Sequence, residues 1–143
     1  MKNLLCLILS FFVIPAGHTQ LASPNESGVT FGHVHLNVSD LEQHKRIWVD
    51  HFNGTIVEKG SHSVIKLPNM LITLTEQKPT MDSIETAMHH FGFKVRRMDK
   101  FLDKWRADGL AVGSMFLGAE GQLNAYVTLP DGVEVEMQED RGL

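Results

Sequence analysis

The sequence predicts an α+β domain built from two βαβββ modules, whose curved mixed sheets form a groove. The stretch from His33 to Val38 returns as His90 to Val95, 57 positions later, and an internal repeat of this kind indicates two similar modules. Trp48 and Trp105 are separated by the same 57 positions. With 143 residues, 43% of them hydrophobic, the chain can bury the core of one compact domain.

The first module is predicted from strand alternation and from turn residues. The first strand alternates with period two, so Val34 faces one way and His33 faces the other. Ser39 or Asp40 is a suitable N-cap for a helix that ends before Asn53-Gly54. The helix is expected to reach about residue 52 with Leu41, Ile47 and Trp48 inward, and three strands are expected at 55–58, 62–67 and 70–76.

The second module is predicted to repeat this order after a polar connector at 77–87, which has one expected helical turn at 81–86. Its helix is expected from Met98 to Asp108, with Gly109 as the C-terminal cap. Four strands are expected at 90–95, 110–116, 122–129 and 133–138, with Pro130-Asp131-Gly132 as the last turn.

Residues 1–22 are predicted to be a secretory signal peptide. Lys2 provides a positive charge at the start, the run from Leu4 to Ile14 is apolar, and Pro15 ends this run. The apolar run is too short to span a bilayer. A short anchor left in place is the alternative. Processing would remove Cys6, the only cysteine, and leave a secreted or periplasmic protein without thiol chemistry.

The mature chain is expected to have a linker at 23–28 and one domain at 29–140, with modules at about 31–76 and 89–138. The formal charge of −4 provides no basic patch for nucleic acid and no polybasic stretch for a membrane surface. A small molecule is therefore the expected partner, and a homodimer is possible because the modules could pair within one chain or across two chains.

Polar side chains gather on the face of the strands that points away from the core. His33 and His90 are equivalent under the repeat and face the same way, and the closing strand places Glu134 and Glu136 on that face. Two imidazoles and one carboxylate form a ligand set that suits divalent iron, manganese, zinc or nickel. The alternative for each residue is an ordinary exposed or groove-lining position.

These residues resemble the vicinal oxygen chelate superfamily, which includes glyoxalase I, extradiol dioxygenases, fosfomycin-resistance enzymes and bleomycin-binding proteins. The resemblance rests on the two modules, a histidine seven residues before Asp40, the strand His90-x-x-x-x-Val95 and the ending Leu129-Pro130-Asp131-Gly132-x-x-x-Glu136. It implies that His33, His90 and Glu136 are the metal ligands.

The resemblance leaves the reaction open between two types. A glyoxalase I has a fourth ligand, a glutamate, at the position that Thr73 occupies here, and threonine cannot be the base. Extradiol dioxygenases place a tyrosine ten residues before the glutamate, where this chain has Tyr126, but this chain has Leu129 before the proline where they have an acidic or small polar residue. They also have a histidine upstream of the tyrosine that has no counterpart at 110–124.

Proton transfer is assigned to His35, Tyr126 or Glu134, although His35 could be merely exposed and Tyr126 merely packed. Thr73 and Asn124 are candidates for the substrate side. Trp48 and Trp105 are expected in the core, and four further histidines are expected at the surface: His44, His51, His62 and His89.

The expected function is that of a secreted, metal-dependent enzyme that acts on a small oxygenated molecule, as a lyase or isomerase or as an oxygenase. The alternative is a binding protein of the same fold that sequesters a small molecule without turnover, as bleomycin-binding relatives do. A purely structural dimer-forming domain is the third possibility, although it would not explain polar residues aligned on three strands.

Overall fold

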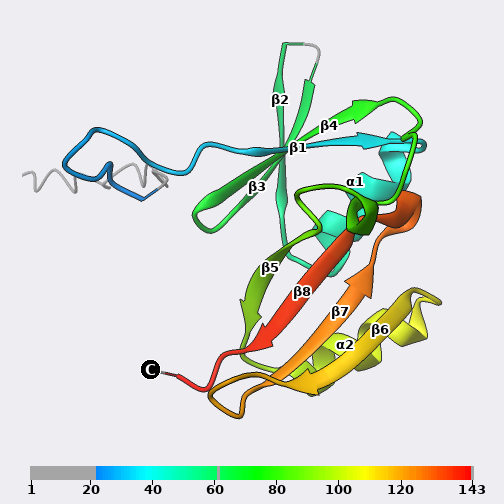
Figure 1. Ribbon diagram of the computed structural model, residues 1–143. Helices are drawn as coiled ribbons and strands as arrows, with labels where there is room; N and C mark the ends of the chain where they lie inside the picture. The colour runs from blue at the N-terminus through cyan, green and yellow to red at the C-terminus, as the bar shows by residue number, and fades with distance from the viewer. Residues whose placement is uncertain (1–21, 61, 143) are drawn as a thin grey trace, which may run out of the picture.

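The computed structural model describes residues 22–60 and 62–142, so the predicted signal peptide lies almost wholly outside the described residues. The chain forms two four-stranded mixed sheets and two helices, which confirms the two βαβββ modules (Figure 1). The first module comprises β1 (Val34–Val38), α1 (Leu41–Asp50), β2 (Thr55–Lys59), β3 (His62–Leu67) and β4 (Met70–Glu76). The second comprises β5 (His90–Val95), α2 (Met98–Ala107), β6 (Ala111–Leu117), β7 (Leu123–Thr128) and β8 (Glu134–Glu139).

The two sheets have the same topology. The strand order is β1-β4-β3-β2 in the first and β5-β8-β7-β6 in the second, and in each the first and last strands of the module pair in parallel. Each parallel pair needs a crossover, which the helix and the two remaining strands provide. The connector contains one 3-10 turn, η1 (Ser83–Glu85), as expected, and a second, η2 (Pro130–Gly132), forms the last turn. Among the described residues, no helix is long and apolar enough to cross a membrane.

Local sequence signals determine the ends of both helices. The Asp40 side chain accepts a hydrogen bond from the backbone N–H of Gln43 at 2.8 Å, which makes it the N-cap of α1. After α1 the chain turns at Asn53, whose φ is 54°, and after α2 at Gly109, whose φ is 74°. Residues with positive φ cannot continue a right-handed helix, so both helices end near the predicted positions.

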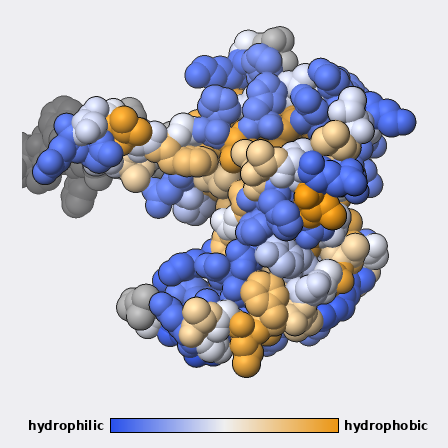
Figure 2. All heavy atoms as spheres, in the orientation of Figure 1, coloured by the Kyte–Doolittle hydropathy of each residue, from blue (hydrophilic) through white to orange (hydrophobic). Residues whose placement is uncertain are grey.

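One hydrophobic core joins the two modules. Trp48 of α1 and Trp105 of α2 are fully buried, as predicted, and residues of both sheets belong to the same cluster. Phe52 lies between the modules, with its ring centroid 5.3 Å from Phe93 of β5 and 6.0 Å from Trp105. Contacts of the helices therefore hold the two modules together. Figure 2 shows a hollow in the surface between the two modules.

The prediction that His44 and His51 lie at the surface was wrong. The His44 side chain is completely buried, with Nε2 3.3 Å from Oδ2 of Asp131, and the His51 side chain is 4% exposed, with Nε2 3.1 Å from Oδ2 of Asp108. Both partners belong to the second module, which covers this side of α1. The helical pattern marks an amphipathic face of one helix but carries no information about a second module that covers its polar residues. His62 and His89 are exposed, as predicted.

Candidate functional site

The parallel strands β5 and β8 bring His90 and Glu136 together. The register pairs His90 with Glu134 and Gly92 with Glu136, so the Glu136 side chain lies over a residue that has no side chain of its own. His90 Nε2 is 3.4 Å from Glu136 Oε2, and the two side chains are 32% and 15% exposed. The pair is thus reachable from solvent but partly enclosed.

His89 holds the other side of the His90 ring. The two Nδ1 atoms are 2.8 Å apart, so one ring donates a hydrogen bond and the other accepts it. The backbone of His89 has a φ of 58°, a conformation that few residues other than glycine adopt without strain. When His90 Nδ1 is the donor, Nε2 keeps its lone pair and faces Glu136, the arrangement that a metal-binding histidine requires. This function of His89 was not predicted from the sequence.

Two amide side chains position Glu136. Asn124 Nδ2 donates to Glu136 Oε1 at 3.0 Å, and Gln138 Nε2 donates to Oε2 at 3.4 Å. Asn124 is 3% exposed, so its contact is with the carboxylate rather than with the open groove. Carboxylates that bind metals are commonly held in this way. The structure therefore gives Asn124 a positioning role, and its predicted contact with substrate stays a prediction.

Tyr126 and Glu134 lie on the same face as the pair. The Tyr126 ring centroid is 5.2 Å from that of His90, and Tyr126 is the register partner of Glu136. Burial and then the charges of Glu136 and Glu134 raise the pKa of the Tyr126 hydroxyl, which therefore stays protonated at neutral pH. Thr128 Oγ1 donates to Glu134 Oε1 at 2.6 Å and fixes that carboxylate.

The first module presents a row of exposed histidines. His33 precedes β1 and is exposed, and the His35 ring lies 6.4 Å from that of His33 and 6.1 Å from that of His62. His35 Nε2 is hydrogen bonded to Thr75 Oγ1 at 2.7 Å, and Thr73 is opposite His35 in the register. The His35 ring is thus fixed by Thr75 while the residue stays exposed to solvent.

The predicted ligands fit a metal ion in part. The 3.4 Å between His90 Nε2 and Glu136 Oε2 allows both atoms to bind one ion at about 2.1 Å. However, residues 22–60 and 62–142 of a single chain contain no group of three histidine, cysteine, aspartate or glutamate side chains that could hold a metal. The second module supplies a pair of ligands, and His33 directly precedes β1 of the other sheet.

Gly92 is predicted to be necessary for the geometry of the pair. A Cβ at this position would lie 2.9 Å from the carbonyl oxygen of Glu136 and 3.3 Å from its Cβ. Gly92→Ala should therefore displace β8 at Glu136, lower stability by about 1–3 kcal/mol and weaken the predicted binding of a metal. Gly113→Ala is the matched control, since its Cβ would meet Tyr126 at an ordinary 3.4 Å. Isothermal titration with Mn²⁺ should distinguish the variants, and equal affinities would contradict the role of Gly92.

Comparison with known proteins agrees with this fold. The family model of the Glyoxalase/Bleomycin resistance protein/Dioxygenase superfamily matches residues 30–137, and the chain belongs to this superfamily. A comparison with curated protein sequences found no match.

Solved structures of the same fold include the fosfomycin resistance protein FosX from Listeria monocytogenes, with a TM-score of 0.69, 16% identity and coverage of 78% of this chain and 93% of that one. A mutant of that protein, complexed with Mn(II) and 1S,2S-dihydroxypropylphosphonic acid, has a TM-score of 0.64, 19% identity and coverage of 76% and 87%. Lactoylglutathione lyase from Agrobacterium tumefaciens has a TM-score of 0.59, 20% identity and coverage of 77% and 92%. At these identities the likeness concerns the fold.

Proposed function

We propose that the protein is an exported enzyme that uses a divalent metal ion to act on a small molecule held through two neighbouring oxygens. The reaction would be of the lyase or isomerase type or of the oxygenase type. The observation that carries this proposal is the pair His90 and Glu136, 3.4 Å apart and held from behind by His89 and Asn124. The FosX complex with Mn(II) and a dihydroxypropyl compound supports the choice of ligand chemistry.

His33, His90 and Glu136 would hold the ion. A bound ion of iron, manganese, zinc or nickel would act as a Lewis acid and stabilise negative charge that develops on the substrate oxygens. Tyr126, whose pKa is raised by burial, would donate a proton or a hydrogen bond to an oxygen of the substrate. Glu134 or His35 would accept a proton removed from the substrate, and Thr128 and Thr75 fix the positions of these two groups.

The third ligand is proposed to come from a second chain. His33 directly precedes β1 of the first sheet, whereas the pair lies on the second sheet, and one chain assembles no three-ligand group within its described residues. In a homodimer the pair of one chain would meet His33 of the partner subunit. The apolar groove beside His90, about 430 Å³ in volume and lined in part by Phe31, Met70 and Met88, offers a surface for that contact.

Metal content tests the proposal directly. The purified protein, reconstituted with iron, manganese, nickel or zinc, is expected to hold about one ion per chain by elemental mass spectrometry. Three protein ligands for one ion are the number typical of a catalytic metal site. Glu136→Gln should abolish this binding, whereas Glu134→Gln, the same change two residues away, should retain it. At an ion concentration 100 times its dissociation constant, the site should add about 2.7 kcal/mol to the stability of the wild type.

Mixing two inactive variants tests the shared site. When chains carrying His33→Ala and chains carrying Glu136→Ala are refolded together, each mixed dimer has one intact set of ligands if the chains share sites. About one ion per mixed dimer is then expected, as for any complete three-ligand site. If instead each chain completes its own site, no combination of these variants binds metal.

A binding protein of the same fold is the second candidate, because one chain brings together two of the three predicted ligands and no complete group. Absence of metal from the wild type after reconstitution with all four metals would contradict the enzyme and favour this candidate. Ligand recovered from the denatured wild-type protein would then identify what it carries.

A further inference from the structure

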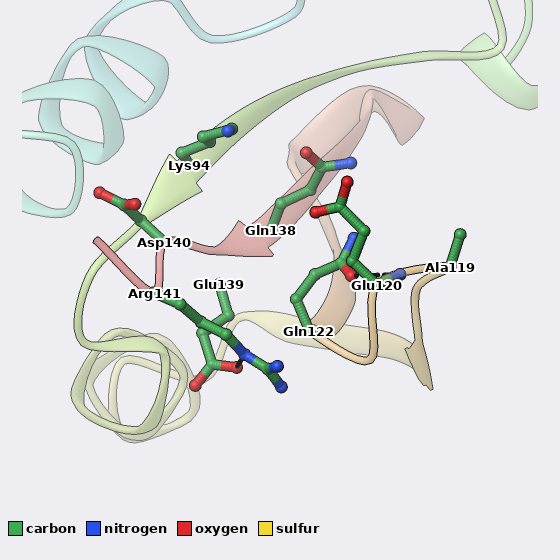
Figure 3. Close-up of a pocket in the computed structure, with 8 residues that line it drawn as sticks. All are labelled: Lys94, Ala119, Glu120, Gln122, Gln138, Glu139, Asp140 and Arg141. Atoms are coloured by element: carbon green, nitrogen blue, oxygen red, sulfur yellow. Dashed lines mark hydrogen bonds and ion pairs between the residues drawn. The ribbon is translucent and has the colours of Figure 1, made fainter. Parts of the chain in front are cut away.

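A polar cavity of about 460 Å³ lies at the far end of the second sheet. Figure 3 shows the side chains around it, which come from β5, β8, the turn between β6 and β7, and the C-terminal residues. Seven of the eight lining residues carry charged or amide side chains, the exception being Ala119. Because the lining residues are mostly charged or amide-bearing, the cavity suits a charged or strongly polar ligand rather than an aromatic one.

The cavity is the continuation of the candidate metal site along two parallel strands. Lys94 follows His90 and Gly92 on the same face of β5, and its register partner on β8 is Gln138. Gln138 lines the cavity and also donates to Glu136, so it lies between the cavity and the predicted metal. Alternate residues of a strand are about 6.6 Å apart, which a small substrate can span.

Most of the charges around the cavity already have partners. Arg141 Nε lies 3.2 Å from Glu139 Oε2, and Asp140 Oδ2 lies 3.3 Å from Nε of Arg96, which is outside the cavity. By contrast, Lys94 and Glu120 form no ion pair with any residue in the described ranges 22–60 and 62–142. Lys94 acts on Asp140 only as a more distant charge. The cavity thus offers one available cation and one available anion.

The sum of the charges limits what the cavity can accept. Two cations, Lys94 and Arg141, face three anions, Glu120, Glu139 and Asp140, so the lining carries a net charge of −1. A doubly negative group would meet net repulsion, whereas a simple cation or anion would gain a contact with only one of the two available charges, which are both exposed. A group that carries a positive and a negative charge can pair with Glu120 and with Lys94.

We propose that the cavity binds a zwitterionic, amino-acid-like end of the substrate. Lys94 would bind its carboxylate and Glu120 its ammonium group, with the amides of Gln122 and Gln138 completing the hydrogen bonds. The turn around Gly118 holds Glu120 in place, because the Glu120 backbone N–H donates to Gln122 Oε1 at 3.1 Å. That the other end of the substrate binds a metal rests on the proposed function. The preference of the cavity for a zwitterionic group does not depend on it.

A deletion series of small probes tests this preference in the metal-free protein. L-alanine carries both charges, propionate lacks the ammonium group, ethylamine lacks the carboxylate, and ethylphosphonate carries a double negative charge when the pH is above its second pKa. In NMR titrations, L-alanine is expected to bind roughly fivefold more tightly than propionate or ethylamine, the gain from one further partly exposed ion pair. It should also shift the side-chain amide signals of Gln122 and Gln138.

Two variants and a matched control complete the test. Lys94→Gln should lower the affinity for L-alanine to that of ethylamine, and Glu120→Gln should lower it to that of propionate. Glu26→Gln makes the same change of charge outside the cavity and should have no effect. Tighter binding of propionate or ethylphosphonate than of L-alanine, or unchanged affinities in both cavity variants, would overturn the proposal. Because chelated metal plays no part, this outcome is separate from the outcome of the metal analysis.

Discussion

Replacing Trp105 with alanine is expected to lower the free energy of unfolding by about 3–5 kcal/mol. The indole is fully buried, and its ring centroid lies 4.8 Å from that of His51 and 6.0 Å from that of Phe52, both in the first module. Its Nε1 also donates to the carbonyl of Ala111 at 2.8 Å, so the substitution leaves both a void and a carbonyl without its partner. Urea denaturation followed by circular dichroism measures the change.

The control for this substitution is Lys100→Ala on the exposed side of α2. A surface change of this kind usually alters stability by less than about 0.5 kcal/mol. Because Trp105 touches both modules, the wild-type protein should unfold in one transition, and tyrosine and tryptophan fluorescence should report the same midpoint as circular dichroism. Two separated transitions, or a Trp105→Ala effect as small as that of Lys100→Ala, would show that the modules are stabilised independently.

The protein is expected to lose stability as the pH falls below about 6.5, the ordinary histidine value. Burial lowers the pKa of His44 despite the nearby carboxylate of Asp131, and burial together with the charge of Lys104 lowers the pKa of His51. Below the ordinary value the unfolded chain binds protons that the folded chain does not. Each histidine therefore costs up to about 1.4 kcal/mol per pH unit until its lower folded pKa is reached.

The ionisation of Asp131 affects stability in a separate, more acidic pH range than that of the two histidines. Partial burial alone would raise its pKa, but hydrogen bonds from Ser39 and the His44 side chain lower it on balance. Its contribution is present above the ordinary aspartate value and is lost only as the pH falls through the lowered pKa. Stability measured between pH 7.5 and 4.5 therefore reports mainly the histidines.

Substitution of the buried histidines tests the origin of this pH dependence. The double variant His44→Asn and His51→Asn should show a flatter pH dependence of unfolding free energy in that range, whatever its absolute stability. His62→Asn, at an exposed histidine, should keep the wild-type slope. An unchanged slope in the double variant would assign the acid sensitivity to other groups.

Most element boundaries could be predicted because their signals are local. Strand alternation and the turns at Gly109 and Pro130-Asp131-Gly132 placed β3, β4 and β5 at the predicted residues and the other strands within two residues. One departure is a register shift in β6 between Val112 and Met115, where a bulge alters the pairing with β7. Nothing in the alternation of β6 marks that bulge.

The candidate site could be predicted only in part. The pairing of His90 with the start of β8 follows from the repeat, because a parallel pair brings those strand faces together. The placement of the first module relative to the second does not follow from any periodicity, and for this reason the burial of His44 and His51 was missed. The same limit applies to His33, whose position relative to His90 depends on module placement. The contacts of His89 and Asn124 depend on side-chain directions that spacing alone does not specify.

The division between helices and sheets has a consequence for how this protein could change over evolutionary time. The helix layer carries Trp48, Trp105 and the aromatic contacts that join the modules, whereas the opposite face of β5 and β8 carries the candidate ligands and the cavity. Substitutions on the second face can alter what is bound with little loss of core packing. New specificities can therefore arise through single replacements at positions such as Lys94, while the scaffold remains folded.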